Sequence, residues 1–126
     1  MSPSVLIVDD EQHIRLLIEQ TLEELLDEGV ELYTASDGEE ALAAIEAQAP
    51  DLVFLDVMMP KRNGLEVARA VRGELGRPDT HIVLLTAKGQ AVDREAGLAA
   101  GANRYLTKPF DPDELLAIAR EVLGSA

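Results

Sequence analysis

Four short apolar runs, each followed at once by polar residues, constrain the fold of this chain more than any other feature. In chain order, Asp9 and Asp10 follow the run 5–8, Asp56 follows 52–55, Thr86 follows 82–85 and Lys108 follows 105–107. Buried runs of this length are typical of parallel strands, and open α/β sheets bind ligands beyond the carboxyl ends of their strands. The pattern therefore predicts a single site that contains three carboxylates, a hydroxyl and an ammonium group.

Helical periodicity fills the stretches between the apolar runs. The first stretch predicts one helix, ended by Gly29, with a single buried stripe of Ile14, Leu17, Ile18, Thr21, Leu22, Leu25 and Leu26. Further helices are predicted after the capping box Ser36-Asp37-Gly38-Glu39, after Asn63-Gly64, over 90–100, and after Asp111-Pro112. Small residues dominate the buried side of the helix over 90–100, so we expect this helix to be the least firmly packed.

The order of these elements predicts the fold class. Residues 31–35 and 104–107 add two strands, so strand and helix alternate five times along the chain. Such alternation predicts an α/β fold of the (βα)5 type, with a five-stranded parallel sheet that is doubly wound and carries helices on both faces. The 126 residues suffice for about one domain and no linker divides them, so we expect a single domain over 1–126.

The chain is acidic and contains no cysteine. It carries 24 acidic and 11 basic residues, a net charge of -13, and its arginines are scattered, so we expect no direct binding to nucleic acid. The lack of cysteine excludes a disulfide framework and a thiolate metal site. The first apolar run is only four residues long before Asp9, so we expect no signal peptide, no membrane span and a cytoplasmic location.

The predicted site has the composition of a metal and phosphate site. Carboxylates crowded at one sheet edge repel one another unless a cation is present. Because Mg²⁺ prefers oxygen ligands, we expect Asp10 and Asp56 to bind it directly and Asp9 to bind it through water. Asp56 is the candidate nucleophile, which would attack phosphorus and form an acyl phosphate. Lys108 would stabilise the phosphoryl oxygens by its charge, and Thr86 by a hydrogen bond.

The same residues lie in motifs that together resemble the receiver domain of two-component response regulators over essentially the whole chain. The motifs are Asp9-Asp10, Asp56 with Met59-Pro60 and Asn63-Gly64, Thr86-Ala87, and Lys108-Pro109-Phe110. The resemblance implies a flavodoxin-like sheet of order 2-1-3-4-5. It also implies that a histidine kinase, a phosphotransfer protein or a small phosphodonor phosphorylates Asp56 with Mg²⁺ present. The chain would then be a phosphoacceptor signalling domain, not an enzyme, with only self-phosphorylation and self-dephosphorylation chemistry.

The resemblance further implies roles for residues around the site. It places the Met58 backbone carbonyl on the metal and makes Lys108-Pro109 a cis peptide bond. On phosphorylation, Thr86 would move toward the phosphoryl group and Tyr105 would turn inward. This movement would reshape the surface made by the fourth helix, fifth strand and fifth helix for a downstream protein partner. Met58 and Lys88 flank the route of the hydrolytic water in this family and should tune the phosphoryl lifetime.

That surface departs from the pattern of receivers that dimerise through ion pairs on it. Arg94 and Glu114 match one such pair, whereas Arg104 and Ile118 stand where an acid and a basic residue are expected. We therefore expect a monomer or a weak dimer.

Three alternatives stay open. The chain could be the receiver of a larger DNA-binding or enzymatic regulator, an aspartate-nucleophile phosphatase for small substrates, or a pseudo-receiver that is never phosphorylated. The phosphatase is disfavoured because no acid stands two residues after Asp56. The two histidines, His13 and His81, are interpreted as ordinary surface residues and not as phosphocarriers.

Overall fold

The computed structural model describes residues 3–59, 63–87 and 94–124, without the side chains of residues 94 and 95. The strands are β1 (Ser4–Val8), β2 (Glu31–Ala35), β3 (Leu52–Asp56), β4 (His81–Ala87) and β5 (Arg104–Lys108). The helices are α1 (Gln12–Thr21), α2 (Glu23–Asp27), α3 (Gly38–Gln48), α4 (Gly64–Arg72), α5 (Arg94–Ala99) and α6 (Pro112–Leu123). Lys88, Pro60 and residues 90–93 of the predicted fourth helix lie outside the described residues.

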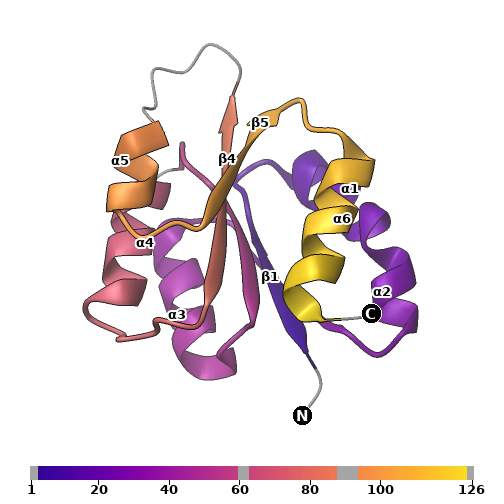
Figure 1. Ribbon diagram of the computed structural model, residues 1–126, viewed down its shortest axis with the longest axis horizontal. Coiled ribbons are helices and arrows are strands. Elements are labelled where there is room, and N and C mark those ends of the chain that lie inside the picture. Colours follow the sequence, from indigo (N-terminus) through magenta and orange to yellow (C-terminus); the bar gives the residue numbers. More distant parts are fainter. Residues whose placement is uncertain (1–2, 60–62, 88–93, 125–126) are drawn as a thin grey trace.

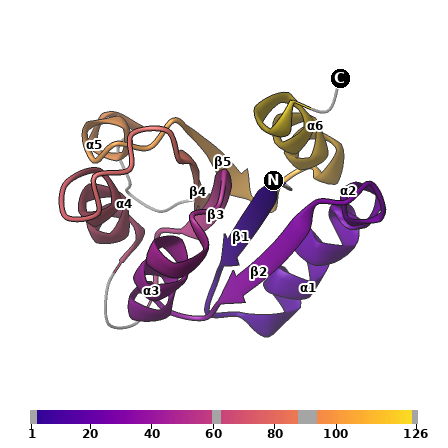
Figure 2. The ribbon, with the colours of Figure 1, turned by 90° about the horizontal axis from the view of Figure 1, so that it is seen from below.

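The strands form one parallel sheet in the order β2-β1-β3-β4-β5. Helices α3, α4 and α5 cover one face of this sheet, and α1, α2 and α6 cover the other (Figure 1). The view from below shows the same two helical layers (Figure 2). The predicted fold class and strand order are confirmed. Among the described helices, none is both long and apolar enough to cross a membrane.

Alternate side chains of the central strands enter two separate apolar layers. In β1, Leu6 and Val8 pack in the layer under α3, α4 and α5, whereas Val5 and Ile7 pack under α1, α2 and α6. All four side chains are fully buried. Because helices cover both faces, every residue of a central strand avoids water, which explains why these strands are continuous apolar runs in the sequence.

The predicted first helix is interrupted at Leu22 and forms two helices, α1 and α2. The Thr21 hydroxyl donates a hydrogen bond to the Leu17 carbonyl oxygen at 2.8 Å, and back-bonding of this kind bends helices. The prediction of one buried stripe was wrong for Leu17, which is 42% exposed, although Ile18 and Leu25 are fully buried.

Two of the predicted helix starts show how the capping residues act. Asn63 and Glu66 form a reciprocal capping box at the start of α4. At α3 the N-cap is Asp37, whose carboxylate accepts from the Glu40 N–H at 2.9 Å. The box predicted to begin at Ser36 was therefore wrong by one residue. Ser36 instead donates its own N–H to the Glu40 side chain at 3.1 Å.

The polar residues of the predicted site lie at one edge of the sheet. Asp9 and Asp10 directly follow β1, as predicted. Asp56 and Lys108 are the last residues of β3 and β5, and Thr86 is the last but one of β4, so these three belong to the strands and do not follow them. The strands run parallel in register, which brings all of these positions to the carboxyl edge.

Candidate functional site

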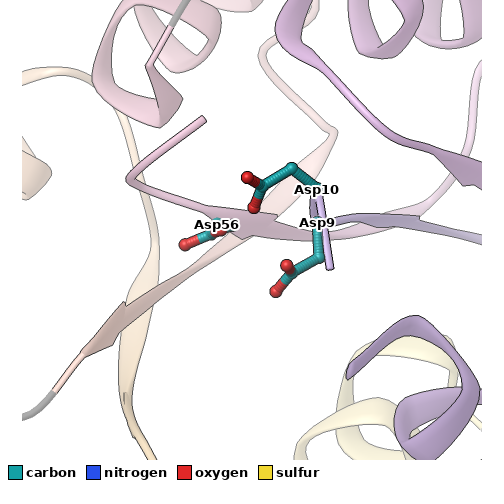
Figure 3. Close-up of side chains that lie close together, drawn as sticks. All are labelled: Asp9, Asp10 and Asp56. Atoms are coloured by element: carbon teal, nitrogen blue, oxygen red, sulfur yellow. The ribbon is translucent and has the colours of Figure 1, made fainter. Parts of the chain in front are cut away.

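Three carboxylates lie together at the carboxyl edge of the sheet. They belong to Asp9, Asp10 and Asp56, and one oxygen atom of each lies within 4.8 Å of the others. Figure 3 shows the side chains of Asp9 and Asp10 leaving the end of β1 in different directions, with Asp56 beside them. The predicted carboxylate cluster is therefore present. Its two adjacent members differ in orientation and burial, since Asp9 is buried and Asp10 is exposed.

Asp9 is held by contacts on both of its carboxylate oxygens. Its side chain is completely buried. Oδ1 accepts a hydrogen bond from the Glu11 N–H at 2.9 Å, and Oδ2 lies 3.0 Å from the Lys108 ammonium. Its backbone N–H donates to the Ala35 carbonyl oxygen of β2 at 3.2 Å. These contacts fix Asp9 as the innermost carboxylate of the cluster.

Asp56 is a buried carboxyl group in a negatively charged setting. It is 3% exposed. Burial, followed by repulsion from Asp9, raises the pKa of Asp56 to about 6, although Lys108 and the Met58 N–H partly oppose this shift. Oδ1 of Asp56 lies 3.3 Å from Lys108 Nζ and accepts the Met58 N–H at 3.3 Å. The carboxylate is thus mostly ionised at neutral pH, at a cost to the folded state.

Lys108 joins β5 to the carboxylate cluster. Its side chain is 14% exposed, and its ammonium contacts both Asp9 and Asp56. Burial alone would lower the pKa of Lys108, but the hydrogen bond to Asp9 and the charge of Asp56 leave it raised, so the ammonium stays charged. The Lys108-Pro109 peptide bond is cis, as the resemblance implies.

Thr86 and Tyr105 lie on adjacent strands close to this edge. Thr86 is 4% exposed, and its hydroxyl donates to the Leu106 carbonyl oxygen at a long 3.4 Å. Tyr105 is half-buried against the apolar layer under α3, α4 and α5. The role of Thr86 and Tyr105 as a switch pair stays a prediction.

The cluster suits a hard divalent cation. The three candidate ligand atoms are all carboxylate oxygens, which Mg²⁺ prefers over nitrogen and sulfur ligands. Asp10 is exposed, so its side of the cluster is open to the water molecules that Mg²⁺ retains. The raised pKa of Asp56 indicates that burial and repulsion outweigh the attraction of Lys108, and a bound cation would remove this imbalance. Direct binding through Asp10, water-mediated binding through Asp9 and a role for the Met58 carbonyl stay predictions.

Known proteins share this sequence pattern and fold. The model of the response regulator receiver domain family matches residues 5–120. The chain belongs to this family. It is a CheY-like receiver domain of the two-component response regulators.

Similar proteins include a longer transcriptional regulator and two chains of about the same length as this one. This receiver is 44% identical over 124 residues to the alkaline phosphatase synthesis transcriptional regulatory protein PhoP of Bacillus subtilis (strain 168), covering 98% of this chain and 49% of that protein. The structure of chemotaxis protein CheY4 of Vibrio cholerae matches with 38% identity and a TM-score of 0.83, over 97% of this chain and 99% of that one. The CheY-like receiver domain protein of Methanospirillum hungatei JF-1 matches with 31% identity and a TM-score of 0.85, over 99% and 96%. The receiver thus spans about half the length of the curated relatives that it matches.

Sequence reasoning missed one residue at the site, Arg15 of α1. Its Nη1 donates a hydrogen bond to the Asp9 backbone carbonyl oxygen at 2.5 Å. Helical periodicity alone gives an arginine on the polar side of α1 no special role. One signal was available in the sequence: Arg15 places a positive charge near the start of a helix, where the helix dipole disfavours it, and it closely follows the acidic pair Asp9-Asp10.

The α5, β5 and α6 elements border an apolar groove on the receiver. The groove has a volume of about 450 Å³ and is lined by residues that include Leu84, Leu98 and Tyr105. At its rim Arg104 pairs with Glu121 of α6 at 2.6 Å, and Ile118 is only 7% exposed. Arg104 and Ile118, which depart from the dimerising pattern, are thus used inside this chain. Glu114 is exposed, and the side chain of Arg94 lies outside the described residues.

Proposed function

We propose that this receiver is the phosphoacceptor of a two-component phosphorelay and that Asp56 is the residue phosphorylated. The donor would be the phosphohistidine of a histidine kinase or of a phosphotransfer protein. One observation carries the proposal: the buried Asp56 carboxylate lies beside two further carboxylates and 3.3 Å from an ammonium group. A carboxylate whose pKa is perturbed by burial and by charged neighbours is the kind of group that functional sites use.

The proposed reaction is in-line phosphoryl transfer. One oxygen of the ionised Asp56 carboxylate attacks phosphorus and forms an acyl phosphate. The phosphorus–nitrogen bond of the donor breaks, and its electron pair stays on the imidazole, which takes up a proton. Lys108, already 3.3 Å from Asp56 Oδ1, stabilises the phosphoryl oxygens by its charge, and the Thr86 hydroxyl donates a hydrogen bond to one of them. Attack of water on phosphorus later releases inorganic phosphate and restores the carboxylate.

We assign the metal to Asp10 and Asp56 as direct ligands, to the Met58 backbone carbonyl, and to Asp9 through water. Three contacts support this division. Both oxygens of Asp9 already have partners, Glu11 and Lys108, whereas Met58 approaches Asp56 through the N–H bond at 3.3 Å. When bound, Mg²⁺ would supply positive charge that neutralises and orients the phosphoryl oxygens.

Signal output is proposed to pass through Thr86 and Tyr105 to the α5, β5 and α6 surface. The hydrogen bond from Thr86 to Leu106 is long at 3.4 Å and therefore weak, so a phosphoryl oxygen can replace its acceptor. Phosphorylation needs to bias two conformations by only about 1–3 kcal/mol to act as a switch. The output partner is proposed to be a downstream protein in the cytoplasm. The receiver itself is proposed to be a monomer or a weak dimer.

A second candidate places the same chemistry inside a larger protein. The match to PhoP covers 98% of this chain but 49% of that transcriptional regulator, which favours a receiver that controls an attached output domain. In either setting we propose that residues 1–126 form one receiver domain. The length of the complete gene separates the two candidates.

Incubation with Mg²⁺ and phosphoramidate, followed by intact mass measurement, tests the proposed function. The wild type should gain one phosphoryl group per chain, and Asp56→Asn should gain none. A phosphomonoester assay distinguishes the enzymatic alternative, because many turnovers per chain would indicate a phosphatase. A wild-type chain that takes up no phosphate would be a pseudo-receiver and would contradict the proposal.

A further inference from the structure

Arg15 makes a contact at the site that the proposed reaction does not use. Its guanidinium Nη1 donates to the Asp9 backbone carbonyl oxygen at 2.5 Å. Arg15 belongs to the first turns of α1, whereas Asp9 directly follows β1, so the bond ties this helix to the carboxylate cluster. A charged donor on a carbonyl oxygen makes one of the stronger hydrogen bonds in proteins.

The helix dipole does not explain the position of Arg15 in α1. A positive charge near a helix N-terminus meets the positive end of the helix dipole and is unfavourable. In the described structure the N-cap residue Glu11 makes no side-chain capping bond, and no acid lies in the first turn of α1 to offset the arginine. The structure does show one hydrogen bond from this side chain, to the Asp9 backbone carbonyl oxygen.

The Asp9 carbonyl belongs to the peptide unit that leads into Asp10. Asp9 is otherwise held by Ala35, Glu11 and Lys108, on its N–H and its two carboxylate oxygens. Asp10 is exposed and projects from the other end of the same planar peptide unit. Fixing the carbonyl therefore fixes the plane from which the Asp10 side chain leaves, and it narrows the positions that the Asp10 carboxylate can take relative to Asp56.

We infer that Arg15 is a positioning residue for the metal site: through the Asp9 carbonyl it holds the Asp9-Asp10 peptide so that the Asp10 carboxylate faces Asp56. This inference rests on the proposed function, because it concerns the site at which Mg²⁺ would bind. Preorganised ligands bind a metal more tightly than ligands that must first be ordered. Arg15 therefore increases Mg²⁺ affinity, although it adds a positive charge near the bound cation.

The sign of this effect distinguishes positioning from simple electrostatics. Titration of Mg²⁺ into Arg15→Gln, followed by amide chemical shifts, should give an affinity roughly tenfold weaker than wild type, as for other outer contacts of metal ligands. Arg15→Lys, which keeps the charge and one compact donor, should recover part of the loss. Arg69→Gln removes an equal charge from an exposed position on α4 and should keep the wild-type affinity. Saturating Mg²⁺ should restore most of the phosphorylation rate that Arg15→Gln loses with phosphoramidate at low Mg²⁺.

Several results would overturn the inference. Unchanged or tighter Mg²⁺ binding by Arg15→Gln, with wild-type binding intact, would mean that Arg15 acts by charge alone or only on helix stability. A slow reaction that saturating Mg²⁺ does not restore would mean that Arg15 acts on the phosphoryl group itself. If Arg15→Gln does not fold, Arg15→Lys provides the test. Wild-type Mg²⁺ affinity in an Arg15→Lys variant that has lost the contact with the Asp9 carbonyl oxygen would likewise overturn the inference. Failure of the wild type to bind Mg²⁺ would overturn both this inference and the proposed metal site, whereas the other results leave the proposed function standing.

Discussion

At the residue scale, burying Asp56 beside Asp9 favours its protonated form, whereas phosphoryl transfer requires the carboxylate. Folding raises the pKa of Asp56 from 3.8 to about 6. The folded protein therefore binds more protons than the unfolded chain between these two values, and stability falls as pH rises through this window. Above it, the ionised carboxylate costs the metal-free protein about 3 kcal/mol.

Replacing Asp56 by asparagine should remove this cost. In the absence of Mg²⁺, Asp56→Asn should raise the free energy of unfolding at pH 7 by up to about 3 kcal/mol and by far less at pH 4. Urea denaturation at several pH values measures the difference. The matched control is Asp79→Asn, at an exposed aspartate before β4, which should show no comparable trend. A stabilisation that does not depend on pH would contradict the account of Asp56.

Lys108 should matter more for reaction than for metal binding. Lys108→Ala removes the ammonium that contacts Asp9 and Asp56, and loss of one such stabilising group typically slows reaction by ~10²–10³-fold. The remaining carboxylates repel each other more, so Mg²⁺ affinity should be retained or increased. Mg²⁺ titration and the phosphorylation rate with phosphoramidate check the two effects separately. Wild-type values for both would show that Lys108 has no role at the site.

At the element scale, the first turn of α4 is stabilised by the capping box of Asn63 and Glu66. Asn63→Ala removes the acceptor for the Glu66 N–H, which lies at 2.9 Å, and should lower the free energy of unfolding by about 1 kcal/mol. Asn63→Asp keeps an acceptor at this position and serves as the control. Urea denaturation gives both values. Equal stability of the alanine and aspartate variants would mean that the cap contributes nothing.

The elements could be predicted from sequence only as far as the apolar pattern records the contacts that decide them. The central strands and their order of appearance were predictable because both faces of a parallel sheet are buried. The break at Leu22 was not, because it accompanies a hydrogen bond from the Thr21 hydroxyl to the Leu17 carbonyl oxygen, which an apolar stripe does not reveal. At α3, neighbouring Ser36 and Asp37 both qualify as caps, and only the fold decides between them.

The site was predictable only in part, namely where its residues lie at strand ends. Asp9, Asp10, Asp56 and Lys108 were brought together by strand ends that the sequence pattern already indicated. Arg15 was missed because its contact joins the start of α1 to a backbone carbonyl, and backbone acceptors carry no signature in the sequence.

At the scale of the whole molecule, the surface of α5, β5 and α6 is expected to signal without forming a tight dimer. Arg104 is already paired with Glu121 at 2.6 Å, so a partner subunit would have to displace that contact. Sedimentation of the protein with Mg²⁺ and beryllofluoride, a phosphoryl mimic, should give a monomer or a weak dimer. The Asp56→Asn variant under the same conditions is the control. A tight dimer that forms only in the beryllofluoride sample would contradict this expectation.

The central claim, that Asp56 accepts a phosphoryl group at a Mg²⁺ site, is tested most directly by locating the modified residue. After incubation with phosphoramidate, borohydride reduces an aspartyl phosphate to homoserine, which peptide mass spectrometry can place in the chain. We predict homoserine at position 56 when Mg²⁺ is present, and little or none when a chelator has removed the metal. Modification at any other residue, or equal modification of Asp56 without the metal, would contradict the account.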